Sequence, residues 1–184
     1  MIEFVFGAVA GGVVVHFFKE HKRAQRKKAA EKNSVTNTEN QLRFIENATL
    51  SKRRLMNKSE YKAFAAIEKF LAAQTKRFSY RLMAQVSMGE FIATENKRAY
   101  SSFNSKRIDF LLIDPYGNPA VAVEYQGDGH FQGNAPERDM VKKTALRKSG
   151  IEFVEIQSNH RPEDITNTVS SALDRYEKQI GSHW

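Results

Sequence analysis

The sequence predicts an α/β fold whose elements follow the order helix, strand, strand, strand, helix, strand, helix (αβββαβα), preceded by one N-terminal transmembrane helix. Two short apolar runs, 108–113 and 120–125, flank the turn sequence DPYGNP and predict a β-hairpin. Apolar residues recur at helical spacing over 59–74 and 163–180. An apolar run at residues 2–18 predicts the transmembrane helix.

The first 18 residues are predicted to form a membrane anchor. The run from Ile2 to Phe18 is at the lower end of the length that spans a hydrocarbon core, and six Lys/Arg follow it within residues 19–28. By the positive-inside rule these cations stay in the cytoplasm. We therefore expect a single-pass protein of the bacterial inner membrane with a cytoplasmic C-terminal domain. A buried helix of the soluble domain is the alternative, although such helices rarely adjoin six cations.

The basic character of the chain lies in one segment. The net charge is +8, and residues 19–58 alone hold twelve Lys/Arg and four Glu. Residues 59–184 hold seventeen Lys/Arg and sixteen Asp/Glu, so this part is almost neutral. A basic cluster beside a membrane span is explained by topology and anionic lipid, and it does not by itself indicate nucleic-acid binding. The predicted domains are an anchor at 1–18, a basic juxtamembrane segment and polar linker at 19–54, and a globular domain at 55–184.

The elements of the globular domain can be placed in order along the chain. N-cap chemistry at 57–60 opens the first helix, and alternating or continuous apolar runs mark the strands. We predict a helix at 59–74, a strand at 80–88, a loop at 89–105, the hairpin strands at 108–113 and 120–125, a helix opened by Pro136 and stopped by Gly150, a strand at 151–156 and a closing helix at 163–180.

Each strand of the predicted hairpin carries one carboxylate. Asp109 lies near the start of the first strand and Glu124 near the end of the second, so in an antiparallel pair the two acids can meet at one end of the sheet. Like charges repel there unless a cation or a shared proton lies between them. A hard divalent metal such as Mg²⁺ accepts oxygen ligands of this kind. The alternative is that both acids are exposed positions on half-buried strands. The absence of cysteine excludes disulfides and thiolate metal sites.

The sequence IDFLLIDPYGNPAVAVEYQGDGH, followed by RDMVKKTALRKSGIEFVEI, resembles an uncharacterised bacterial domain family of the PD-(D/E)XK restriction-endonuclease-like superfamily, related to very-short-patch repair endonucleases. The family's pattern is a DF strand, an E-x-D segment with a following His, an R-D-x-x-K segment and a Gly-Ile turn into a strand. This chain departs from it at the third position of the E-x-D segment, where it has Gln126. The resemblance covers about residues 55–180. The resemblance implies a restriction-endonuclease-like mixed sheet flanked by helices. It also implies a metal-dependent nuclease that hydrolyses phosphodiester bonds of nucleic acid, with DNA favoured.

The resemblance also assigns roles to individual residues. Asp109 and Glu124 match the metal-binding acids and, with the Tyr125 carbonyl, are expected to hold Mg²⁺ or Mn²⁺. His130 or Lys142 is expected to assist proton transfer or to stabilise charge on the phosphate. The remaining matches are Glu60 with the acid of the first helix, Arg138 and Asp139 with the R-D-x-x-K segment, and Gln126 with the third position of the E-x-K or E-x-D motif.

Several of these residues also have simpler explanations. Glu60 suits a solvated position at a helix N-terminus, His130 a surface loop and Lys142 a solvated helix face. Gln126 cannot ionise, so either Lys142 supplies the missing charge or catalysis is lost. Two further functions therefore stay open: an inactive nuclease-like module that binds nucleic acid, and a membrane-tethered interaction module. Apart from the resemblance, the sequence does not indicate a preference for DNA or RNA, and it does not indicate the oligomeric state.

Overall fold

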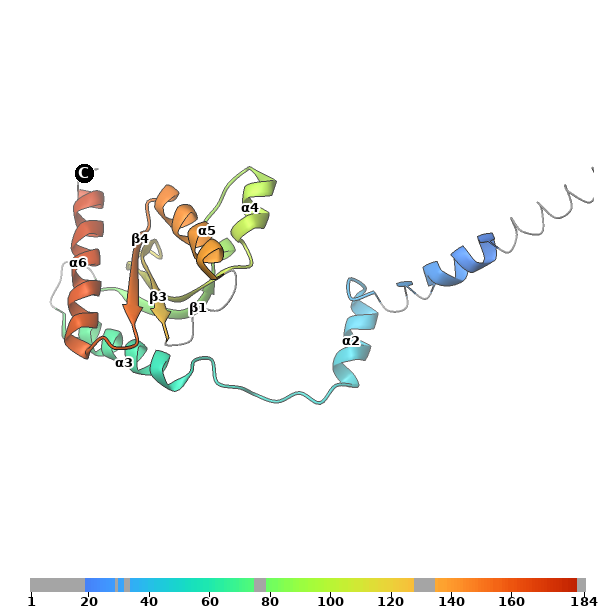
Figure 1. Cartoon of the computed structure of the whole chain (residues 1–184), viewed down its shortest axis with the longest axis horizontal. Coiled ribbons are helices and arrows are strands. Elements are labelled where there is room, and N and C mark those ends of the chain that lie inside the picture. Colours follow the sequence, from blue (N-terminus) through green and yellow to red (C-terminus); the bar gives the residue numbers. More distant parts are fainter. Residues whose placement is uncertain (1–18, 29, 32–33, 75–78, 128–134, 182–184) are drawn as a thin grey trace, which may run out of the picture. The chain divides into compact units, whose positions relative to one another are not determined.

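The computed structural model describes residues 19–28, 30–31, 34–74, 79–127 and 135–181, with no description of the side chains of 135–138. The chain divides into two compact units, Met1–Arg53 and Arg54–Trp184 (Figure 1). The second unit begins one residue before the predicted start of the globular domain.

The first unit contains helix α2 (Thr38–Glu46), where the sequence predicts a polar linker. Asn37 is the N-cap of α2, and its side chain accepts hydrogen bonds from two backbone N–H groups of the first turn. The side chain of Asn40 is buried and donates to the carbonyls of Glu31 and Ser34. These local bonds explain why a polar segment is helical here.

The prediction of a membrane-anchored fold class is corrected. None of the helices in the described part of the chain is both long enough and apolar enough to cross a bilayer. The longest, α6 (Pro162–Gly181), has sufficient length, but it is amphipathic and packs one face on the domain core. The anchor predicted at 1–18 lies outside the described residues. The fold is therefore described as mixed α/β, and the predicted single-pass inner-membrane location is not supported.

The second unit is built on a four-stranded mixed sheet of order β1-β2-β3-β4. The first three strands pair antiparallel, and β3 pairs parallel with β4. A parallel pair needs a crossover connection, and α5 supplies it between β3 and β4. The elements besides α6 are α3 (Lys58–Ala73), β1 (Arg81–Ser87), the 3₁₀ turn η1 (Met88–Glu90), α4 (Lys97–Phe103), β2 (Arg107–Ile113), β3 (Pro119–Gln126), α5 (Ala135–Lys148) and β4 (Glu152–Gln157).

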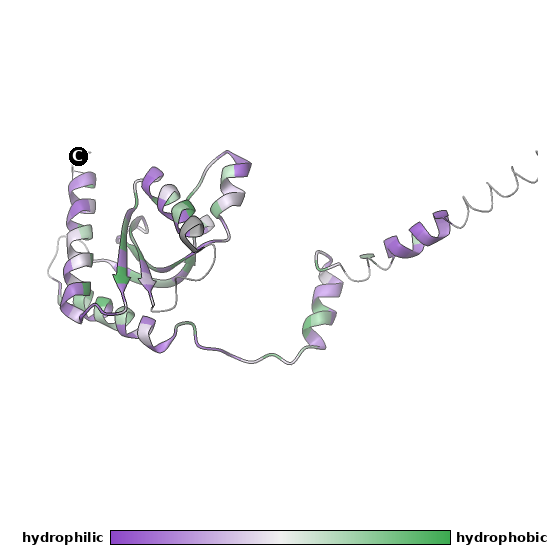
Figure 2. Ribbon diagram, in the orientation of Figure 1, coloured by the Kyte–Doolittle hydropathy of each residue, from purple (hydrophilic) through white to green (hydrophobic). Residues whose placement is uncertain are grey.

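Helices cover both faces of the sheet, which gives three layers (Figure 1). On one face, α3 and α6 form a core with Phe110, Leu112, Val121 and Val123 of the central strands. On the other face, α4 and α5 contribute to a second core that includes Leu111 and Ala122 of the same strands. The strands carry most of the hydrophobic colouring in Figure 2, as expected for a sheet buried on both sides.

The hairpin turn between β2 and β3 is fixed by Asp114, as its composition predicts. Asp114 Oδ1 accepts the backbone N–H groups of Tyr116 and Asn118, and Gly117 adopts a φ of +87°. The Tyr176 hydroxyl on α6 donates to Asp114 Oδ2 at 3.1 Å. The turn is thereby tied to the closing helix, which holds the two central strands in register.

One helix was missed in the predicted loop at 89–105. Asn96 is the N-cap of α4, and its side chain accepts the backbone N–H groups of Arg98 and Ala99. Phe103 at the end of α4 is buried in the second core. The Ser- and Asn-rich composition obscured a helix that is stabilised by its cap and by one buried aromatic residue.

Candidate active site

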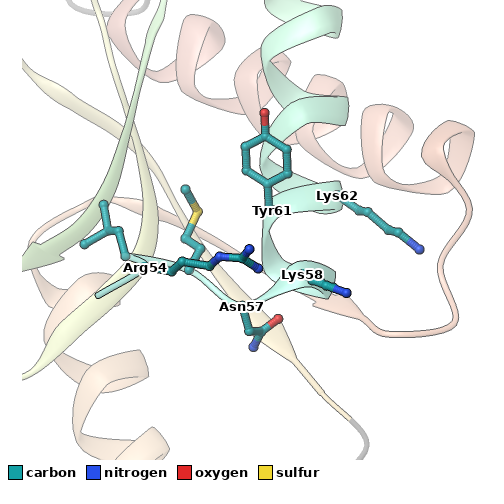
Figure 3. Close-up of a pocket in the computed structure, with 7 residues that line it drawn as sticks. Arg54, Asn57, Lys58, Tyr61 and Lys62 are labelled. Carbon is teal, nitrogen blue, oxygen red and sulfur yellow. The ribbon is translucent and has the colours of Figure 1, made fainter. Parts of the chain in front are cut away.

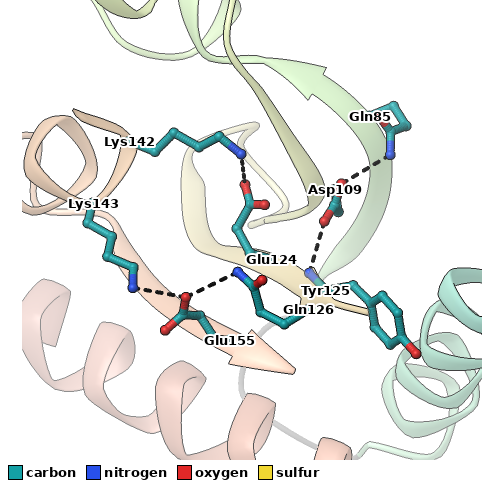
Figure 4. A network of polar contacts seen from close by, with 8 residues as sticks. All are labelled: Gln85, Asp109, Glu124, Tyr125, Gln126, Lys142, Lys143 and Glu155. Atoms are coloured by element: carbon teal, nitrogen blue, oxygen red, sulfur yellow. Dashed lines mark hydrogen bonds and ion pairs between the residues drawn. The ribbon is translucent and has the colours of Figure 1, made fainter. Parts of the chain in front are cut away.

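A row of four polar side chains crosses the sheet on the face that α5 covers (Figure 4). Phe110 pairs with Val123, so the next position brings Asp109 on β2 opposite Glu124 on β3. In the parallel register of β3 and β4, Glu124 lies beside Glu155. On the other side of the row, Gln85 on β1 lies opposite Asp109. Three carboxylates and one amide therefore lie side by side on consecutive strands.

Asp109 is held by two donors. Its Oδ2 accepts the Tyr125 backbone N–H at 2.9 Å, and its Oδ1 accepts the Gln85 side-chain amide at 3.2 Å. The Asp109 carboxylate thus accepts a hydrogen bond from a backbone N–H just beyond the end of the ladder between β2 and β3. These bonds fix the orientation of a side chain that is only partly buried.

Gln85 has an unusual backbone. Its φ of +57° makes it the one non-glycine residue with a left-handed conformation among those the structure describes. A left-handed backbone costs a residue with a Cβ about 1–2 kcal/mol. The ladder between β1 and β2 is interrupted at this position, between the pairs Ala84–Phe110 and Val86–Ile108. Strained residues of this kind concentrate at functional sites, and Gln85 contacts a predicted metal ligand.

Glu124 is buried and paired. It is 8% exposed, and its Oε1 lies 2.8 Å from the Lys142 ammonium on α5. Burial raises the pKa of the Glu124 carboxyl from 4.5 to about 7, and the charges of Asp109 and Asp139 act in the same direction, whereas Lys142 opposes them. The burial of Glu124 and its closeness to Asp109, both predicted from the hairpin, are confirmed.

Gln126 is part of a separate contact. Its side-chain amide donates to Glu155 Oε1 at 3.3 Å, and the same oxygen lies 2.9 Å from the Lys143 ammonium. Lys142 and Lys143 are adjacent on α5, yet one pairs with Glu124 and the other with Glu155 (Figure 4). The side chain of Gln126 is therefore bonded to β4, and the cation beside Glu124 comes from α5.

The remaining predicted residues have different outcomes. Glu60 lies in the first turn of α3, where its Oε2 accepts the Asn57 backbone N–H as part of a capping box. Asp139 lies on α5, close enough to act on the Glu124 pKa. Arg138 is in α5, but its side chain is not described, and His130 lies outside the described residues.

The residues that could hold a metal supply oxygen only. Asp109 and Glu124 provide carboxylates, and Tyr125, which directly follows Glu124 in β3, provides a backbone carbonyl. Within the described residues, no group of three or more His, Asp or Glu side chains is arranged to hold a metal ion. A cation here thus depends on two carboxylates, a backbone carbonyl and water, which is a donor set suited to hard divalent metals such as Mg²⁺.

Sequence reasoning missed two members of the row, Gln85 and Glu155, and one counter-ion, Lys143. The alternation of polar and apolar residues over 151–156 predicts which face of the sheet Glu155 lies on. Its contact with Gln126 depends on the parallel pairing of β3 and β4, which the local sequence does not specify. The sequence gives no signal for the left-handed backbone of Gln85, because glutamine is not among the residues that favour this conformation.

Comparison with known proteins gives the family. The family described as "Protein of unknown function (DUF2726)" matches residues 52–173, which include the whole sheet and α5. The chain belongs to this family. All the residues of the polar row lie within the stretch that DUF2726 matches.

Two relatives cover most of the chain. An uncharacterised protein of Haemophilus influenzae is 38% identical over 172 residues, which are 89% of this chain and 89% of that protein. The uncharacterised protein y4bI of Sinorhizobium fredii is 36% identical over 135 residues, which are 73% of this chain and 96% of y4bI. No solved structure matches the chain significantly. The names of these relatives state no activity, so a function has to be argued from the site.

The strain at Gln85 can be tested through stability. In an ordinary strand, Gly is less stable than Ala by about 0.5–1 kcal/mol. At this left-handed position we expect the reverse: Gln85→Gly should have a free energy of unfolding about 1 kcal/mol higher than Gln85→Ala. Both variants lose the amide donor to Asp109, so their difference isolates the backbone. Urea unfolding of the two variants measures it, and a more stable Ala variant would contradict the left-handed conformation.

Proposed function

We propose that this DUF2726 domain hydrolyses phosphodiester bonds of nucleic acid in a metal-dependent reaction, with Asp109 and Glu124 as the metal-binding acids. The observation that carries the proposal is the pair itself. Two carboxylates lie opposite each other on neighbouring strands, one of them 8% exposed and with its pKa raised to about 7. Titratable groups perturbed in this way are concentrated at functional sites.

The site fits a divalent metal electrostatically. The charge of Asp109 helps to raise the Glu124 pKa, so the pair as it stands favours binding a proton. A cation between the two carboxylates removes that repulsion, and the Tyr125 carbonyl can add a third oxygen. When bound, Mg²⁺ or Mn²⁺ supplies Lewis-acid polarisation of the phosphate and lowers the pKa of a bound water.

Lys142 and Gln126 divide a role that one residue of the E-x-K motif would fill. Lys142 lies 2.8 Å from Glu124, where it favours the ionised carboxylate that a metal requires. Its ammonium can also stabilise negative charge that builds on the phosphate oxygens. Gln126 donates to Glu155 and so orients the neighbouring strand. This division lets the site keep a cation although its third motif position is not ionisable.

Mn²⁺ binding tests the proposal. Calorimetric titration of the full-length protein should show Mn²⁺ binding, and Mn²⁺ should raise the melting temperature. Asp109→Asn and Glu124→Gln should each abolish both effects, together with any Mn²⁺-dependent cleavage of DNA or RNA, because each removes one anionic ligand. The fold should survive Asp109→Asn, since an amide oxygen can still accept the Tyr125 N–H.

A matched control lies in the same row. Glu155→Gln removes a carboxylate that is already bonded to Lys143 and Gln126, so Mn²⁺ binding and cleavage should persist. If the unmodified protein shows no Mn²⁺ binding and no change in melting temperature, the catalytic proposal fails.

Nucleic-acid binding without hydrolysis is the second candidate. The bonding of Gln126 to Glu155 favours it, because the third motif position then takes no part at the acid pair. Under this function, oligonucleotides should bind with a strong dependence on salt concentration. Neither Mn²⁺ nor Asp109→Asn should change that binding, and no cleavage should be detected.

A further inference from the structure

A basic pocket lies at the start of α3, apart from the polar row. It has a volume of about 540 Å³ and is lined by residues 54–58, 61 and 62. This size is within the range of small-molecule pockets and is sufficient for one nucleobase. Met56 joins the pocket to the domain core, whereas Tyr61 is 58% exposed. The pocket therefore has an apolar base and an exposed aromatic side chain at its edge (Figure 3).

The charges around this pocket have one sign. Arg54, Lys58 and Lys62 line it, and no acidic side chain is among its described lining residues. Residues 54–184 carry nineteen Lys/Arg and sixteen Asp/Glu, so three cations within nine residues are a local concentration. Lys58 and Lys62 are one helical turn apart, about 6 Å along the axis, and extend in the same direction (Figure 3).

The N-terminal amides of α3 do not account for this positive surface. Asn57 Oδ1 already accepts the backbone N–H groups of Ser59 and Glu60, and the Glu60 carboxylate accepts the Asn57 N–H. The side chains of Arg54, Lys58 and Lys62 therefore provide the attraction for an anion. Three separate cations that line one pocket suit a ligand with repeated negative charges better than a single phosphate ion.

We propose that this pocket binds a single strand of nucleic acid, with Arg54, Lys58 and Lys62 contacting phosphates and Tyr61 stacking on an unpaired base. An exposed tyrosine beside a basic groove is the combination that single-strand-binding surfaces use. A stacked duplex does not offer a base face to a pocket of this size, so a single strand fits better than a double strand.

The pocket lies at the same end of the sheet as the acid pair of the polar row. The first turn of α3 lies at the end of the sheet where β3 ends, as two views show (Figures 1 and 3). Glu124 is near that end of β3, and Asp109 lies opposite it. A nucleic-acid strand held at residues 54–62 thus lies at the same end of the domain as the acid pair, with α3 on the opposite face of the sheet from that pair. The inference rests on the proposed nucleic-acid substrate, but not on metal binding or hydrolysis.

Affinity for a labelled oligo(dT) tests the interface. Fluorescence anisotropy of the full-length protein in EDTA measures binding without cleavage. Tyr61→Ser should weaken binding at least five-fold, because stacking is worth about 1–3 kcal/mol per base, and Tyr61→Phe should retain it. The pair Lys58→Ala/Lys62→Ala should reduce the slope of log affinity against log salt by about 0.7 for each cation. Lys69→Ala, an exposed cation further along α3, is the matched control and should change neither quantity.

A second measurement separates this surface from the basic residues of the first unit. An oligonucleotide that carries 5-iodouracil cross-links to aromatic side chains on irradiation. Peptide mapping should identify Tyr61 as the adduct, and Tyr61→Ser should remove it. Adducts confined to other residues, or equal affinities of Tyr61→Ser and Tyr61→Phe, would overturn the proposal. Equal displacement of the oligonucleotide by polyglutamate at matched charge would also overturn it and would indicate an acidic-peptide partner.

The outcomes also distinguish this inference from the proposed hydrolysis. Asp109→Asn should bind oligo(dT) in EDTA as the unmodified protein does, because Asp109 is not part of the pocket. Normal Mn²⁺ binding without an effect of Tyr61→Ser would reject the interface alone. The opposite result, with an effect of Tyr61→Ser but no Mn²⁺ binding, would reject hydrolysis alone.

Discussion

Replacing Lys142 with methionine is expected to lower the free energy of unfolding by about 3 kcal/mol at pH 8. The side chains of Lys142 and Glu124 are only 18% and 10% exposed, so the variant leaves a buried carboxylate without its counter-ion. The negative charges of Asp109 and Asp139 destabilise the unpaired Glu124 carboxylate further, since both already act to raise the Glu124 pKa. The loss should be smaller at pH 6, where Glu124 can bind a proton instead. Urea unfolding at the two pH values measures both effects.

The neighbouring lysine provides the matched control for this experiment. Lys143 also pairs with a glutamate on the sheet, but the side chains of Lys143 and Glu155 are 45% and 32% exposed. Lys143→Met should therefore cost less than about 1 kcal/mol. The double variant Lys142→Met/Glu124→Gln should recover most of the loss, because it removes the unpaired charge. Equal costs for the two lysine variants would show that the Lys142–Glu124 pair is not buried in solution.

The sheet was predictable because its strands are encoded locally. Apolar runs around Asp109 and Glu124, with a turn that Asp114 and Gly117 can form, define the hairpin without knowledge of the rest of the chain. Helix α4 was not predictable from periodicity, since its stability comes from the Asn96 cap and a single buried residue, Phe103. The predicted membrane span depended on an apolar run and the six cations that follow it, and the described helices do not support it.

The candidate site was predictable in part for a related reason. Glu124 follows three consecutive apolar residues, which indicates a buried strand, and burial is the first cause of its raised pKa. The pairing of Lys142 with Glu124, and not Lys143, depends on the rotation of α5 over the sheet, which no local pattern specifies. The resemblance singled out Lys142, and the structure brings it to Glu124. Neither the left-handed backbone of Gln85 nor its side-chain bond to Asp109 has a signal in the local sequence.

The pH dependence of stability is expected to change when Glu124 is replaced by glutamine. The Glu124 pKa is about 7 in the folded protein and 4.5 in its ordinary state, so between these values the folded protein binds a proton that the unfolded chain releases. Stability from this group is therefore greatest below pH 4.5 and is lost as the pH rises through 7. Each pH unit between the two pKa values is worth 1.36 kcal/mol, which gives a loss of about 3 kcal/mol in total.

The Glu124→Gln variant should not lose this stability as the pH rises. The difference in unfolding free energy between the unmodified protein and the variant should fall by about 2.5 kcal/mol from pH 5 to pH 8, as measured by urea unfolding. The other titratable groups are present in both proteins and cancel in the difference. Asp109→Asn should reduce the pH dependence only in part, because it removes one of the charges that raise the Glu124 pKa and leaves burial in place. A difference that stays constant between pH 5 and 8 would mean that Glu124 titrates normally, and the acid pair would then lose the property on which the proposed metal site depends.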